Sequence, residues 1–158
     1  MYQRILLPID DSAAAMAAFA EALQLAQCTS AQLLLVHVLD VSRSALAPMG
    51  MPGMEYATYQ ESRQENGAQR EHFLHDLSEQ AAAAGVPCSS KLIEKWGGNP
   101  AKTLLAEADA WQADLIVMGT HGNTGLMHLI FGSVAENLLH HSKVPVLLLR
   151  KEEDVVDD

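Results

Sequence analysis

Three glycines and a serine near the end of the chain have the types and spacing of a phosphate-binding loop. Two residues separate Gly119 from Gly122, and nine residues separate Gly122 from the pair Gly132 and Ser133. The apolar run 114–118 precedes this segment, and an amphipathic stretch follows it. A helix start leaves backbone N–H groups unpaired and partly positive, and glycine lets an anion approach them. The pattern predicts a phosphate cradle between a strand and a helix.

Two better-known phosphate motifs are absent from the sequence. There is no GxxxxGK[ST], which excludes a P-loop, and no two glycines are separated by a single residue, which excludes GxGxxG. The purely structural alternative is that Gly132 and Ser133 form only a turn and a helix N-cap, because serine is a favoured cap. His121 lies inside the loop and could be a general base, although a histidine that only hydrogen-bonds within its loop is the commoner case.

The composition indicates one domain and argues against nucleic acids and membranes as partners. The 158 residues suit a single core. Ten basic and 20 acidic residues give a net charge of −10, which disfavours nucleic acid and anionic membranes. No apolar run approaches the twenty or so residues of a membrane span, and residues 1–8 do not resemble a signal peptide. We therefore expect a cytoplasmic protein.

Strand and helix patterns alternate along the chain. Apolar runs of strand length occupy 4–9, 32–39, 88–94, 114–118 and 144–149. Helical patterns follow an Asp11 or Ser12 cap, run from about 68 to a stop at Gly85, open at Asn99-Pro100, and follow Gly132-Ser133. This alternation predicts an α/β domain with a parallel sheet covered by helices on both faces. Trp96 and Trp111 are expected to be packing anchors, with Trp96 at the crevice edge as the alternative.

Three residues at strand ends could share one ligand crevice. Asp10, Val38 and Gly119 each stand at or just after the carboxyl end of a predicted strand. In open parallel sheets, ligands bind at this edge, where the winding direction reverses. A cation that bridges phosphates needs oxygen ligands, and Asp10 is the nearest candidate for Mg²⁺.

Three segments fall outside the regular pattern. Pro and Gly residues within 41–67 predict a mobile loop insertion, either an inert excursion or a methionine-bearing lid or partner surface. Pro145 marks the run 144–149 as an edge strand, because proline cannot donate to a sheet ladder. Residues 151–158 form a highly charged tail that we expect to be frayed.

Five sequence blocks, in the correct order, resemble the universal stress protein family. They are 5–12, 33–38, 114–122, 131–136 and 144–150, and the resemblance spans residues 1–150. It implies a Rossmann-like or flavodoxin-like five-stranded sheet in the order 3-2-1-4-5. The glycine spacing is that of the ATP-binding branch, so the resemblance also implies bound ATP, or ADP or AMP, with Mg²⁺. It further implies homodimers joined through the last strand, 144–149.

The resemblance assigns the nucleotide-binding residues one by one. The implied set is Pro8, Ile9, Asp10, Val38, Met118, Gly119, Gly122, Gly132, Ser133 and Val134. Val38, with Pro8 and Ile9, would form the wall against adenine, while Met118 would cover the sugar or base. Gly119 and Gly122 would form the ribose and phosphate turn, and residues 132–134 would meet the β- and γ-phosphates. At Asn123 many relatives carry an arginine, so one positive phosphate contact is missing.

The predicted function is therefore a dimeric, ATP-binding stress or signalling module that acts on an unknown regulatory protein. The sequence contains no evident catalytic constellation, so we do not expect an enzyme. Two alternatives stay open. One is slow ATP hydrolysis or phosphate transfer to Ser133, and the other is a nucleotide-free interaction module.

Overall fold

The structure, a computed structural model, describes residues 1–42, 56–120 and 131–150, with only the helical backbone described for 56–63. Its five strands are β1 (Arg4–Pro8), β2 (Gln32–Asp40), β3 (Cys88–Lys95), β4 (Leu115–Gly119) and β5 (Val146–Leu149). They form one sheet in the order β3-β2-β1-β4-β5, and every pairing is parallel. The predicted fold class and strand order are confirmed.

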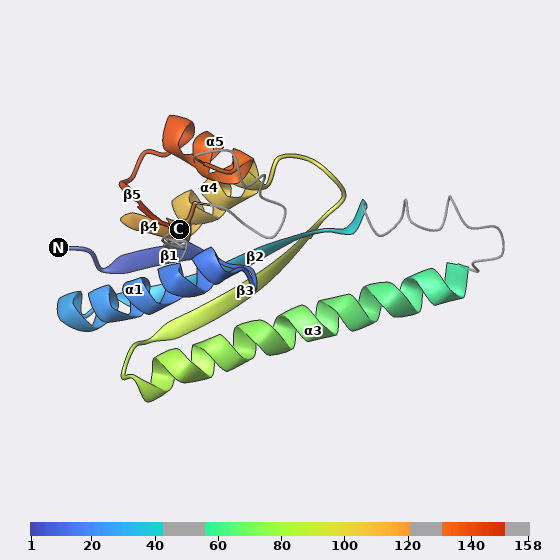
Figure 1. The fold of residues 1–158 in the computed structure, drawn as a ribbon, viewed down its shortest axis with the longest axis horizontal. Helices are drawn as coiled ribbons and strands as arrows, with labels where there is room; N and C mark the ends of the chain where they lie inside the picture. The colour runs from blue at the N-terminus through green and yellow to red at the C-terminus, as the bar shows by residue number, and fades with distance from the viewer. Residues whose placement is uncertain (43–55, 121–130, 151–158) are drawn as a thin grey trace, which may run out of the picture.

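Helices cover both faces of this sheet (Figure 1). The helices are α1 (Ala13–Thr29), α3 (Tyr56–Ala83), α4 (Pro100–Trp111) and α5 (Ser133–His141). α1 and α3 pack on one face through a core that includes Phe19 and Leu74, and α4 and α5 pack on the other through Leu104 and Leu138. Burial on both faces explains why β1, β2 and β4 are apolar along most of their length.

Two of the predicted helix caps are present. The Ser12 hydroxyl accepts the N–H of Ala15 at 3.2 Å and so caps α1. The Asn99 side chain accepts the N–H of Ala101 at 3.0 Å and caps α4, with Pro100 in the first helical position. These contacts satisfy amides that the helix itself leaves unpaired. Gly85, with a φ of +78°, lies two residues beyond the end of α3, as the predicted stop requires.

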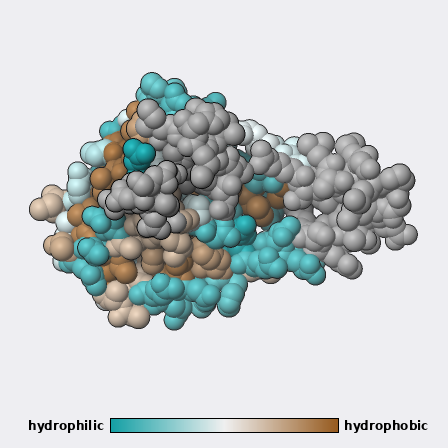
Figure 2. All heavy atoms as spheres, viewed as in Figure 1, coloured by the Kyte–Doolittle hydropathy of each residue, from teal (hydrophilic) through white to brown (hydrophobic). Residues whose placement is uncertain are grey.

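The prediction of a mobile loop over 41–67 is wrong for its second half. α3 begins at Tyr56, twelve residues before the predicted start near 68, and residues 43–55 lie outside the described part of the chain. Residues 56–66 contain no proline or glycine, and Gly67 is buried within the helix. A helix with one narrow contact face needs few apolar residues, so its polar composition does not exclude it. Figure 2 shows a largely hydrophilic outer side of α3.

The last strand is shorter than predicted. β5 covers only 146–149, because Pro145 has no N–H for the ladder, although its carbonyl accepts the N–H of Ile116 at 3.0 Å. β5 is an edge strand, as expected. The predicted tail 151–158 lies outside the described residues. Among the residues that are described, no helix is both long enough and apolar enough to cross a membrane.

Candidate functional site

The exit of β1 and the start of α1 form the first wall of the site. Pro8 ends β1, and the buried Ile9 donates its N–H to the carbonyl of Val36 at 3.0 Å. The Asp10 carboxylate then accepts the N–H of Ser12 at 2.9 Å. The turn that carries Asp10 therefore leads directly into the capped first turn of α1.

The exit of β4 lies against that same helical turn. A Cβ placed on Gly119 would be 2.7 Å from the carbonyl carbon and 2.8 Å from the Cβ of Ala14. Real Cβ atoms do not approach other atoms so closely, so only glycine lets β4 end here without a shift of α1. This contact brings Gly119 next to the segment that follows Asp10, as the sequence predicts. The contact with Ala14 therefore explains a glycine at position 119 by packing alone, without a ligand.

The start of α5 is tied to the exit of β4. The Gly132 N–H donates to the carbonyl of Thr120 at 2.7 Å, and the Thr120 N–H donates to the carbonyl of Leu149 at 2.9 Å. Gly132 is the N-cap of α5 and provides no side-chain cap, while Ser133 is the first helical residue. Ser133 is therefore not the N-cap of α5, which the purely structural alternative would require it to be. The first amides of α5 begin beside the end of β4, on the edge of the sheet that carries Asp10.

The exit of β2 forms the neighbouring wall. Val38 is half-buried and packs against the core shared with α4 and α5. Two residues later, one Asp40 oxygen accepts the N–H of Ser42 at 2.9 Å and the N–H of Gly97 at 3.1 Å. Asp40 thus joins the exit of β2 to the loop after β3. No local sequence pattern points to Asp40, because its partner Gly97 is distant along the chain.

The other predicted site residues fall into three groups. Val134 is half-buried beside Ser133, whose side chain is exposed, so both are at the expected helix start. Met118 is only 6% exposed and packs between the sheet and α4 and α5, so its side chain offers little surface to a sugar or base. Gly122, like His121 and Asn123, lies outside the described residues.

Charged and titratable side chains gather where β1 and β2 end. Arg70 of α3 is 3.5 Å from an Asp11 oxygen, a half-exposed ion pair that the sequence gives no means to predict. The His37 ring contacts the carbonyl of Ile9 through Nδ1 at 2.7 Å. Burial lowers the pKa of His37 below 6.5, and Arg70 lowers it further. The Ile9 carbonyl, Asp10 and Asp11 oppose this shift.

The metal-binding capacity of this edge is small. Within the described ranges, no group of three or more His, Cys, Asp or Glu side chains is placed to hold an ion. The turn after β1 carries two carboxylates: Asp11 pairs with Arg70, and one oxygen of Asp10 accepts the Ser12 N–H. Such an arrangement fits an ion that takes most of its ligands from phosphates and water, which is how Mg²⁺ commonly binds.

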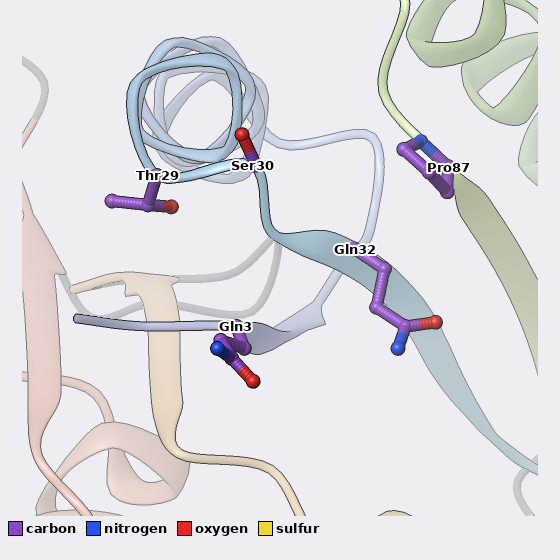
Figure 3. Close-up of a pocket in the computed structure, with 5 residues that line it drawn as sticks. All are labelled: Gln3, Thr29, Ser30, Gln32 and Pro87. Atoms are coloured by element: carbon purple, nitrogen blue, oxygen red, sulfur yellow. The ribbon is translucent and has the colours of Figure 1, made fainter.

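An open polar depression lies at the opposite edge of the sheet. Figure 3 shows its lining, which is Gln3, Thr29, Ser30, Gln32 and Pro87. These residues lie just before or at the start of strands, or at the end of α1, so they stand at the amino-terminal edge of the sheet. The lining contains no ionisable side chain, and backbone groups there bond one another, as when the Gln32 N–H donates to the Gln3 carbonyl at 2.9 Å. Because of this lining, we do not assign the depression to a charged ligand.

The strand order defines an open parallel α/β sheet in which β1 and β4 are the central strands where the winding direction reverses, and in such sheets ligands bind at the carboxyl edge of the strands. The chain belongs to the universal stress protein family, whose model matches residues 1–150. It is 32% identical over 152 residues to a universal stress protein of Methanocaldococcus jannaschii, covering 96% of this chain and 84% of that protein.

Solved structures of similar proteins agree with this fold. A universal stress protein from Lactobacillus plantarum shares 25% identity with a TM-score of 0.77, over 94% of this chain and 98% of that one. A family member from Arabidopsis thaliana, solved with AMP bound, has 18% identity and a TM-score of 0.66, over 96% and 94% of the chains. A member from Archaeoglobus fulgidus, solved in complex with dAMP, has 20% identity and a TM-score of 0.60, over 94% and 98%.

Proposed function

We propose that this chain binds an adenine nucleotide, ATP or else ADP or AMP, at the carboxyl edge of β1, β2 and β4. The observation that carries the proposal is the start of α5, where Gly132 provides no side-chain cap and is bonded to Thr120 at the exit of β4. Unpaired amides at a helix start attract anions. Family members of known structure contain AMP or dAMP, which supports an adenine nucleotide as the anion.

In this proposal each part of the crevice has its own task. The amides of Ser133 and Val134, with the exposed Ser133 hydroxyl, bind the phosphates, while Gly132, whose own N–H is bonded to the Thr120 carbonyl, leaves the approach to them open. Pro8, Ile9 and Val38 provide the apolar wall for the base. Gly119 lets β4 end close to α1, and Met118 contributes its backbone rather than its buried side chain. Gly122 is proposed for the phosphates on the family resemblance, and it lies outside the described residues.

Mg²⁺ is proposed to accompany a triphosphate. Asp10 would supply a carboxylate oxygen, and the phosphates and water would supply the rest, because Asp10 belongs to no larger ligand cluster in the described residues. When bound, the ion would neutralise part of the phosphate charge. The Asp10 turn would hold it near the start of α5 without direct help from a second acidic ligand.

The proposed output is regulatory rather than catalytic, and it depends on a dimer. β5 is an apolar edge strand in which Leu147 is 38% exposed, and such an edge needs a cover. We propose that a second copy covers it and that nucleotide binding alters which regulatory protein the dimer contacts. Light scattering should give a dimer mass for the native chain and a monomer mass for Leu147→Lys. A Leu147→Lys dimer would contradict this interface.

Nucleotide binding is tested directly with the purified chain. We expect an adenine nucleotide in the supernatant of the denatured protein, and calorimetric binding of Mg-ATP and of AMP. In Gly132→Val, the isopropyl group stands where the phosphates must approach, so binding should be lost while the fold is kept. Gly67→Ala on α3 is the control and should bind normally. Unchanged affinity in Gly132→Val would contradict the cradle.

The same preparation separates the alternatives. Several turnovers of ATP per minute, abolished by Gly132→Val, would favour an enzyme. Phosphate incorporation that disappears in Ser133→Ala would favour autophosphorylation, for which the exposure of Ser133 is the one favourable observation. No binding of either nucleotide by the native chain would favour an interaction module without nucleotide.

A further inference from the structure

His37 is a β2 residue whose side chain holds the exit of the neighbouring strand. Its Nδ1 lies 2.7 Å from the carbonyl oxygen of Ile9. A carbonyl can only accept a hydrogen bond, so Nδ1 must carry the proton and donate it. β1 ends at Pro8, one residue earlier, and the Ile9 N–H is already bonded to Val36 of β2. Both backbone groups of Ile9 are thus held by β2, one by the backbone and one by the His37 ring.

The residue held in this way directly precedes Asp10. The Asp10 carboxylate accepts the Ser12 N–H at 2.9 Å, and the Ser12 hydroxyl caps α1. The turn from Ile9 to Ser12 is therefore anchored at its start by His37 and at its end by the α1 cap. Asp10 lies between the two anchors, so the direction of its carboxylate depends on both of them.

Packing alone does not explain a histidine at this position. His37 is half-buried between Val36 and Val38, where an apolar side chain of similar size would bury comparable surface. The groups that act on the ring are the Ile9 carbonyl just after β1, Asp10 and Asp11 in the turn before α1, and Arg70 of α3. Because burial and Arg70 both lower its pKa, His37 is neutral at neutral pH, and its contribution to the turn is the single Nδ1–H donor.

We propose that His37 is a positioning residue of the nucleotide site, in which the Nδ1–H bond to the Ile9 carbonyl aims the Asp10 turn at the phosphates and their cation. The inference rests on the proposed nucleotide-binding function and adds to it a residue that need not touch the ligand. If the inference is correct, the affinity for the nucleotide depends on a hydrogen-bond donor at the place of His37 Nδ1, and not on the imidazole ring or its charge.

Amide variants isolate the donor. In Asn, the side-chain nitrogen is the same number of bonds from the backbone as histidine Nδ1, whereas in Gln it is one bond further away. His37→Asn should therefore keep the Kd for Mg-ATP within about threefold of the native value. His37→Gln and His37→Leu should each weaken binding about tenfold, the equivalent of one hydrogen bond.

A destabilised control separates positioning from general stability. Val86 is 2% exposed and precedes β3 at the opposite edge of the sheet, so Val86→Ala should lower the Tm without changing the Kd. Calorimetry is done well below the Tm of every variant. The Ser12 amide resonance, which reports the bond to Asp10, should move in His37→Leu and return to its native position in His37→Asn.

The possible failures are distinguishable. Native-like affinity in His37→Gln and His37→Leu, or equal losses in His37→Asn and His37→Leu, would overturn the positioning role. If His37→Leu does not fold, His37→Gln gives the same comparison. If the native chain binds neither Mg-ATP nor AMP, the proposed function fails and the positioning role fails with it. In that case the Ser12 resonance still shows whether His37 holds the turn.

Discussion

Two helices begin at the carboxyl edge of the sheet in opposite ways. α1 starts with a side-chain cap, because the Ser12 hydroxyl accepts the Ala15 N–H, and α4 is capped in the same manner by Asn99. α5 starts at Gly132, which has no side chain to offer. At α1 the Ala15 amide is satisfied by a side chain of the chain itself, whereas the N-cap of α5 provides no such acceptor. We therefore assign the start of α1 to the stability of the fold and propose the start of α5 for a ligand.

Gly119 at the end of β4 and Gly132 at the start of α5 differ in a similar way: one is required by packing and the other is not. Gly119 is required by the backbone and Cβ of Ala14, which belong to the first turn of α1. Gly132 has φ −70° and ψ 163°, a conformation open to any residue, so its own backbone does not demand glycine. Substitutions at Gly119 should therefore change stability, and substitutions at Gly132 should change binding.

The largest effect is expected at Gly119. Gly119→Ala places a methyl group 2.7 Å from a backbone atom of Ala14, so α1 or β4 must shift, at a cost of about 3 kcal/mol of unfolding free energy. Gly67→Ala is the matched control, because its new Cβ meets only a side-chain oxygen of Glu94 at 3.4 Å, inside a helix where alanine is favoured. Urea unfolding should show a lower unfolding free energy for Gly119→Ala and a higher one for Gly67→Ala than for the native chain. An unchanged unfolding free energy in Gly119→Ala would mean that α1 can shift away from β4 at little cost.

The next effect is on binding, at Gly132. Gly132→Asp supplies the missing cap, so it should stabilise the free protein by a few tenths of a kcal/mol. Its carboxylate also occupies the first amides of α5 and repels phosphate, so the Kd for Mg-ATP should rise about 30-fold. Asn99→Asp adds the same charge to the start of α4 and should leave the Kd unchanged. Equal Kd values for Gly132→Asp and the native chain, measured by calorimetry, would reject α5 as the phosphate site.

A smaller effect is expected at the α1 cap. Ser12→Ala removes the acceptor for Ala15 and should cost about 1 kcal/mol of stability. Asn99→Ala should cost a similar amount, because it removes the corresponding cap of α4. Chemical denaturation of both variants measures these losses. If Ser12→Ala unfolds at the native denaturant midpoint, water replaces the cap and the contrast with α5 disappears.

The smallest effect concerns pH and His37. Its folded-state pKa lies below 6.5, so the unfolded chain binds the proton more readily. The stability from this group is therefore complete above pH 6.5 and declines as the pH falls towards the folded-state pKa. His37→Asn removes this component, so the difference in unfolding free energy between native and variant should shrink between pH 7.5 and 5. A constant difference across that range would contradict the lowered pKa.

Local patterns predicted much of this architecture. The five strands, the Ser12 and Asn99 caps and the stop at Gly85 each depend on residues within a few positions of one another. The strand order came from the family resemblance and is confirmed. The start of α3 was misjudged because the prolines and glycines before Tyr56 were taken to disrupt a polar segment that forms a helix.

Side-chain direction was harder to predict. Met118 was expected beside a ligand and is buried under α4 and α5, because a strand with two covered faces gives no alternation to show which way a residue points. Trp96 was expected to be a packing anchor and is 68% exposed, whereas Trp111 does pack, with the Arg4 guanidinium 4.8 Å from its ring centroid. Arg70 and Asp40 were missed, because their partners are far away in the sequence.

The sequence by itself determined where α1 and α4 are capped and where glycines interrupt the chain, since these depend on the chemistry of adjacent residues. Only the tertiary structure decided that Gly119 faces Ala14, that His37 holds Ile9 and that Asp40 reaches Gly97. These contacts join residues brought together by the strand order and by helices packed on particular faces. Their geometry follows from burial of the whole core, which no short stretch of residues specifies.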